Sequence, residues 1–175
     1  DNADLPFPLI FSGPASAAGY FQQIDQFLKN MLGEQISKRY EIVIDDAART
    51  ARLASEGAQA VKNYREKRSD AFFFNWMLNV DQDFQQPFEV THQSMRELSL
   101  HQDQPPHVLA SNLRKAFSGI VTGNVKEHGI GMVEEHGPFE IVGTPEVADM
   151  LSGLLKAFVA QKRMRLPTTE YKPCF

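Results

Sequence analysis

The chain has very little cysteine and no long apolar segment. Its one cysteine, Cys174, cannot form an internal disulfide, so we expect a reducing compartment and a cytoplasmic location. No apolar run approaches the roughly 20 residues needed to span a bilayer, so the sequence predicts no membrane-spanning helix. Excess positive charge is also missing. The net charge of -4 and the pI near 5.7 argue against binding to DNA, RNA or anionic membranes.

The usual motifs for phosphate, metal and nucleophilic chemistry are absent. The chain has no Gly-Gly pair, no GxGxxG, no Walker A lysine motif and no GxSxG. Its five histidines lie far apart and form no zinc spacing with the one cysteine, so we expect no metal. The adjacent pairs Asp45-Asp46 and Glu134-Glu135 cannot share a helix face and make no acid–base dyad. From these patterns we assign no catalytic residue and expect no cofactor.

Strand and helix alternate over the first 70 residues. Residues 8–11 and 40–44 are short, continuous apolar runs, which are typical of strands buried on both faces of a parallel sheet. Between them, apolar residues recur every three or four positions up to Gly33, which predicts an amphipathic helix. This order is typical of an α/β sheet.

A long alanine-rich helix is predicted after the second strand. Either Asp45 or Asp46 can cap its N-terminus, and the helical pattern ends near residue 68. We expect Ala51, Leu53 or Ala54, Ala58 and Val61 on its inward face and Gly57 to be a weak point within it.

The two predicted strands end in residues that suit a ligand site. Ser12-Gly13-Pro14 and Asp45-Asp46 occupy the carboxyl ends, where ligands collect in α/β sheets. Gly13 allows a ligand to approach the backbone closely. Ser12, Gly13 and Pro14 are therefore candidates for lining a nucleotide cleft, and the alternative is an ordinary turn between strand and helix.

Residues 62–76 (KNYREKRSDAFFFNW), called the seam below, combine cations with aromatic rings. Four cations, Lys62, Arg65, Lys67 and Arg68, precede the aromatic run at 72–76. Cations suit phosphate and flat rings suit a base. The alternative is a solvated helix end, whose C-terminal dipole favours cations, followed by aromatic residues of the core.

The chain beyond residue 70 changes to a helix-rich pattern with irregular stretches. We expect a helix from Pro106, interrupted or closely packed at the glycines of SGIVTGNVKEHGIG, and a strand at 139–142. A closing helix is predicted with Thr144 as N-cap, and residues 168–175 show few features. Lys126, on the glycine-flanked turn, is a candidate phosphate ligand or simply an exposed lysine. The predicted domains are 1–70 and 71–175.

A family resemblance covers nearly the whole chain. Residues 5–48 resemble the end of the Rossmann-like domain of the Lonely Guy, or lysine decarboxylase-like, nucleotide hydrolases. SDAFFFNW, QPFEVTH, AFSGIVTGNVKEHGI, EEHGPFEI and FVAQKRMRLP resemble the appended C-terminal domain of the bacterial pyrimidine/purine nucleotide 5'-monophosphate nucleosidases. The resemblance implies the end of a Rossmann-like parallel sheet followed by a mostly helical C-terminal domain.

The resemblance also implies hydrolysis of the N-glycosidic bond of a nucleoside monophosphate to free base and ribose 5-phosphate. The family's catalytic PGGxGTxxE segment and nearby arginine do not occur here, so we expect a fragment of a longer chain that is inactive alone. The rival interpretation is a non-catalytic nucleotide-binding or oligomerisation module. A phosphoribohydrolase restricted to modified bases lacks the same motif and stays open.

The residues of this chain are then expected to support nucleotide binding, regulation and oligomerisation. We assign Arg65 and Arg68 to phosphate, Asp70 to a ribose or base donor and Phe72 to stacking, with Asn75 beside them. The expected partners are a nucleoside monophosphate, a phosphorylated nucleotide effector and further copies of the same protein.

Overall fold

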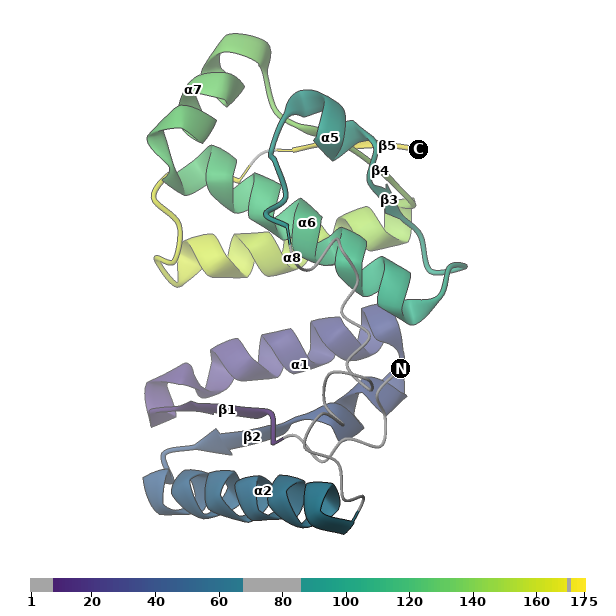
Figure 1. Cartoon of the computed structure of the whole chain (residues 1–175). Helices are drawn as coiled ribbons and strands as arrows, with labels where there is room; N and C mark the ends of the chain where they lie inside the picture. Colours follow the sequence, from purple (N-terminus) through teal and green to yellow (C-terminus); the bar gives the residue numbers. More distant parts are fainter. Residues whose placement is uncertain (1–7, 68–85, 170) are drawn as a thin grey trace. The chain divides into compact units, whose positions relative to one another are not determined.

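The chain forms two compact units, Asp1–Gln86 and Pro87–Phe175. The computed structural model describes residues 8–67, 86–169 and 171–175 (Figure 1). Each unit contains short parallel strands and longer helices, so the predicted α/β fold, rich in helix toward the C-terminus, is confirmed. None of the helices in the described ranges is both long enough and apolar enough to cross a membrane. The domain boundary predicted near residue 70 lies outside the described residues.

The first unit pairs two strands in parallel. Its elements are β1 (Ile10–Gly13), η1 (Ala15–Ala17), α1 (Ala18–Leu32), η2 (Glu34–Arg39), β2 (Glu41–Ile44) and α2 (Ala47–Lys67). Ile10 lies beside Glu41, and Gly13 lies beside Ile44. Both predicted strands are present, although β1 begins two residues later than its apolar run.

Apolar residues of α1 and the strands form the interior of this unit. Phe27, Met31 and Val43 are buried, and the Phe11 ring lies 5.0 Å from the Tyr40 ring. Gly33 ends α1 as predicted, because its φ of 87° is a conformation that favours glycine.

The inward face of α2 differs from the prediction. Leu53 and Val61 are half-buried as predicted, but Ala51 and Ala58 are exposed and Gly57 is half-buried, so the predicted inward face is confirmed only in part. Gly57 is a close contact rather than a weak point, since a Cβ there would lie 2.5 Å from the Pro8 ring. This turn of α2 packs closely against Pro8 because Gly57 has no side chain, and not because the turn is apolar.

The second unit builds a three-stranded parallel sheet in the order β3-β4-β5. Its elements are α5 (His92–Arg96), β3 (Ser99–Leu100), α6 (Pro106–Val125), α7 (Glu127–His136), β4 (Glu140–Gly143), α8 (Pro145–Ala160) and β5 (Lys172–Cys174). α6 and α7 lie between β3 and β4 in the chain, and α8 lies between β4 and β5 (Figure 1). The predicted strand and closing helix are confirmed, and β5 was missed.

The glycines of the α6–α7 region both pack closely and flank a break. α6 continues through Gly119, where an added Cβ would lie 2.1 Å from the Met95 sulfur. The helix ends at Val125, and α7 begins after Lys126. In α7, a Cβ at Gly129 would lie 2.2 Å from the Thr122 carbonyl oxygen. Both predicted consequences of the glycines therefore occur, at different positions.

Among the described residues, more buried apolar side chains lie in the second unit than in the first. Helix α8 begins as predicted, with Pro145 in its first turn and the Thr144 hydroxyl accepting from the Val147 N–H. The buried apolar residues described here are Met95, Leu98, Leu100, Leu109, Leu113, Ala116, Ile120, Phe139, Ile141, Val147, Leu151, Leu154 and Leu155.

Candidate functional site

The carboxyl ends of β1 and β2 come together, as the parallel arrangement predicts. The Asp45 N–H donates to the Gly13 carbonyl oxygen at 2.8 Å. The hydroxyl oxygens of Ser12 and Thr50 lie 2.9 Å apart, so the end of β1 is tied to the first turn of α2. These contacts define the candidate site of the first unit, called the strand-end site below.

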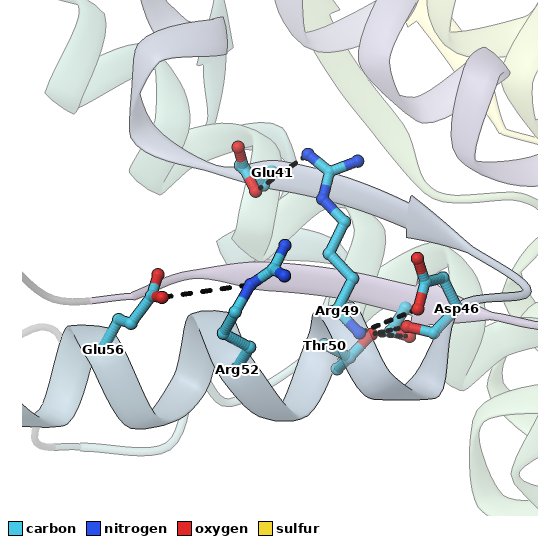
Figure 2. A network of polar contacts seen from close by, with 7 residues as sticks. Glu41, Asp46, Arg49, Thr50, Arg52 and Glu56 are labelled. Atoms are coloured by element: carbon cyan, nitrogen blue, oxygen red, sulfur yellow. Dashed lines mark hydrogen bonds and ion pairs between the residues drawn. The ribbon is translucent and has the colours of Figure 1, made fainter.

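The first turn of α2 completes the strand-end site (Figure 2). Asp46 caps the helix, its Oδ1 accepting from the Arg49 N–H at 2.7 Å. Thr50 donates its hydroxyl proton to the Asp46 carbonyl oxygen at 2.9 Å, so Ser12 is the donor to Thr50. Arg49 Nη2 lies 3.5 Å from a carboxylate oxygen of Glu41. The site therefore carries a helix N-terminus capped by Asp46 and flanked by one exposed ion pair.

The three predicted cleft residues also have structural roles. A Cβ at Gly13 would lie 2.9 Å from the Phe21 ring, so packing against this ring already requires a glycine. Pro14 precedes η1, and its carbonyl oxygen accepts from the Ala17 N–H at 2.8 Å. Contact of Ser12, Gly13 and Pro14 with a nucleotide stays a prediction.

The seam is described only in part. Arg65 is exposed on the last turn of α2. Arg68, Asp70, Phe72 and Asn75 lie outside the described residues, so the proposed phosphate and base contacts stay predictions.

Lys126 is exposed at the junction of α6 and α7. Its N–H donates to the Thr122 carbonyl at 3.2 Å, and its own carbonyl accepts from the Ile130 N–H at 2.9 Å. The Lys126 side chain makes no ion pair with any residue in the described ranges. The junction therefore holds this cation at the surface, where contact with phosphate stays a prediction.

A charged cluster around Glu140 was missed from the sequence. Lys172 of β5 lies 2.6 Å from one carboxylate oxygen of Glu140, and Arg96 of α5 lies 3.5 Å from the other. The hydrogen bond from Lys172, aided by nearby cations, lowers the pKa of Glu140. Because β5 was not predicted, no local signal could have brought these residues together.

Two histidines lie beside this cluster. His92 Nε2 is 2.9 Å from the Gly137 carbonyl oxygen, and the His92 and His136 rings meet edge to face at 5.6 Å. Both rings line a cavity of about 310 Å³ together with Arg96 and Glu140. Within the described ranges, no group of three or more histidine, cysteine or carboxylate side chains is placed to hold a metal ion.

Comparison with known proteins identifies the family. The family model "Pyrimidine/purine nucleotide monophosphate nucleosidase, C-terminal" matches residues 58–175. Proteins named pyrimidine/purine nucleotide 5'-monophosphate nucleosidase from Escherichia coli K12 and from Escherichia coli O157:H7 are each 47% identical over 99% of this chain. The chain spans 38% of the length of these relatives. It therefore belongs to the family of C-terminal domains of the pyrimidine/purine nucleotide monophosphate nucleosidases.

Proposed function

We propose that this chain is the C-terminal part of a nucleoside 5'-monophosphate nucleosidase, which hydrolyses the N-glycosidic bond to free base and ribose 5-phosphate. The observation that carries the proposal is the 47% identity to the Escherichia coli nucleosidase, which extends over both compact units. The chain alone is inactive in this proposal, because its sequence lacks the family's glycine-rich glutamate motif.

The strand-end site and the seam would then support nucleotide binding by the longer enzyme. A helix N-terminus attracts anions, and the N-terminus of α2 lies at the strand-end site. Arg65 and Arg68 supply guanidinium groups that can bind phosphate bidentately. Asp70, Phe72 and Asn75 would contact the sugar and base of the substrate or of a phosphorylated effector. The proposal includes a cytoplasmic homo-oligomer.

The test compares base release from a nucleoside monophosphate by the 175-residue chain and by a full-length enzyme that ends in it. We expect release only by the full-length enzyme. In that enzyme, replacing both Arg65 and Arg68 by alanine should raise KM or the effector concentration for half-maximal effect by about tenfold, because charge-assisted contacts to phosphate are lost.

Arg52→Ala provides the control for the double variant. Arg52 is an exposed arginine of the same helix, and its Nε lies 3.9 Å from Glu56, so this change should leave the kinetics unaltered. Unchanged kinetics in the double variant would contradict the role of the seam. A full-length enzyme that binds nucleotide but releases no base would favour the non-catalytic binding module.

A further inference from the structure

A cavity of about 470 Å³ lies in the second unit between α8 and the segment that follows it. The apolar lining includes Leu155 and Val159 of α8 on one side and Pro167 on the other. The volume is within the range of small-molecule sites, which are mostly apolar with a few placed polar groups. We call it the α8 cavity, and the chain can be followed from α8 back toward β5 in Figure 1.

The outer wall of the α8 cavity is anchored to α6. The side chain of Asn124 is buried, and its Nδ2 donates to the Thr168 carbonyl oxygen at 2.6 Å. Its Oδ1 accepts from the N–H groups of Arg165 and Leu166 at 2.9 and 3.2 Å. The wall is therefore held in position by the protein itself, so the cavity does not need a ligand to form.

A hydroxyl pair provides a polar end to the cavity. Tyr171 donates its proton to the Ala148 carbonyl oxygen at 2.9 Å, and burial raises the pKa of Tyr171, which keeps the phenol protonated. The hydroxyl of Ser152, 3.1 Å from the Tyr171 oxygen, must then donate to it. The lone pairs of Ser152 are left to accept a hydrogen bond from a ligand.

The surroundings of the cavity are positively charged. Lys156 lines the cavity, is exposed and makes no ion pair within the described ranges. The sequence from 149 to 170 also carries Lys162, Arg163 and Arg165, so its basic residues outnumber its two acidic residues, Asp149 and Glu170, by four to two. A negatively charged ligand is therefore favoured over a neutral or cationic one.

We propose that the α8 cavity binds a small amphipathic anion, with its apolar body between Val159 and Pro167 and its negative charge at Lys156. This site goes beyond the hydrolysis of nucleoside monophosphates and does not depend on it. Loss of nucleosidase activity would not affect this binding, and loss of this binding would not affect the nucleosidase activity.

The test uses anilinonaphthalene sulfonate, a fluorescent aromatic anion, and its uncharged analogue phenylnaphthylamine. We expect the anion to bind the purified protein saturably at one site. Ala160→Phe, which places a ring in the cavity from an exposed helix position, should abolish this binding. Lys156→Gln should lower the affinity for the anion about fivefold, as expected for the loss of an exposed ion pair, and should leave the affinity for the uncharged analogue unchanged.

Lys162→Gln is the matched control, because Lys162 has the same charge but does not line the cavity. It should lower the affinity for the anion much less than Lys156→Gln does, because a charge outside the cavity is screened by solvent. Non-saturable binding, binding that survives Ala160→Phe, or equal losses in Lys156→Gln and Lys162→Gln would overturn the proposal. If Ala160→Phe lowers the urea midpoint of unfolding, the comparison of the two lysine variants decides.

Discussion

Asn124 and Thr122 are the two buried polar residues within the described ranges. The Asn124 side-chain amide makes three hydrogen bonds, and all three partners are main-chain groups of residues 165–168. A buried amide that is satisfied in this way stabilises one path of the chain, because any other path leaves polar groups without partners.

Asn124→Ala should therefore lower the free energy of unfolding by about 2–3 kcal/mol, since it leaves backbone donors and an acceptor unpaired near the core. Urea denaturation followed by circular dichroism measures this change. The control is Gln93→Ala, an exposed amide of the same unit, which should change the free energy by less than about 0.5 kcal/mol. Equal effects of the two substitutions would show that the Asn124 contacts do not stabilise the fold.

Single residues were predictable where their contacts are local. Either Asp45 or Asp46 is predicted as one helix cap and Thr144 as another, and Asp46 and Thr144 each accept from an N–H three residues ahead. The partners of Asn124 lie more than 40 residues away along the chain, and no local pattern indicates them. Ser12 lies between these cases, because the rule for parallel strands places it beside the start of α2 without naming Thr50.

At the scale of the helices, α7 approaches α6 through a glycine. Gly129→Ala should destabilise the protein by about 2 kcal/mol, because its Cβ would meet a backbone oxygen of α6, Thr122 O, at 2.2 Å and the helices would have to separate. Chemical denaturation measures the loss.

Gly131→Ala is the matched control on the same helix. Nothing lies within 4 Å of a Cβ added there, so the better helix propensity of alanine should stabilise the protein by up to about 1 kcal/mol. If Gly129→Ala and Gly131→Ala changed the free energy of unfolding in the same direction, close packing would not be the reason for a glycine at position 129.

The elements that sequence patterns missed have physical reasons. The alanines of α2 are apolar enough to predict an inward face, but Ala51 and Ala58 are exposed, and the half-buried positions include Thr50 and Gly57 beside the predicted Leu53 and Val61. β5 contains Pro173, which cannot donate to a ladder and is accepted here because β5 is an edge strand. The inward face of α2 and the edge position of β5 both depend on packing partners that the local sequence does not indicate, whereas β1, β2 and β4 carry their own apolar runs.

For the whole molecule, the two units differ in their buried cores. Within the described ranges, Phe27, Met31 and Val43 are the buried apolar residues of the first unit, against thirteen in the second. Residues 87–175 expressed alone should unfold in one cooperative urea transition, because the buried side chains of this unit form a core within it. Circular dichroism measures this transition. A gradual loss of signal from residues 87–175 would contradict this expectation.

The match to the family begins within the first unit. The family model starts at residue 58, inside α2, whereas the compact units divide after Gln86. The second half of α2 therefore belongs to the C-terminal domain by sequence and to the first unit by contacts. No pattern of apolar residues predicts this overlap, since the helix itself is continuous.

The all-parallel sheet of the second unit has a consequence for how it folds. β3 and β4 are separated by residues 101–139, and β4 and β5 by residues 144–171, so no two neighbouring strands can meet through a tight hairpin. The chain loses conformational entropy when each long loop closes, and the strand contacts offset this loss only after the strands have paired. The helices can form locally and early, and the assembly of the sheet then limits the folding rate of this unit.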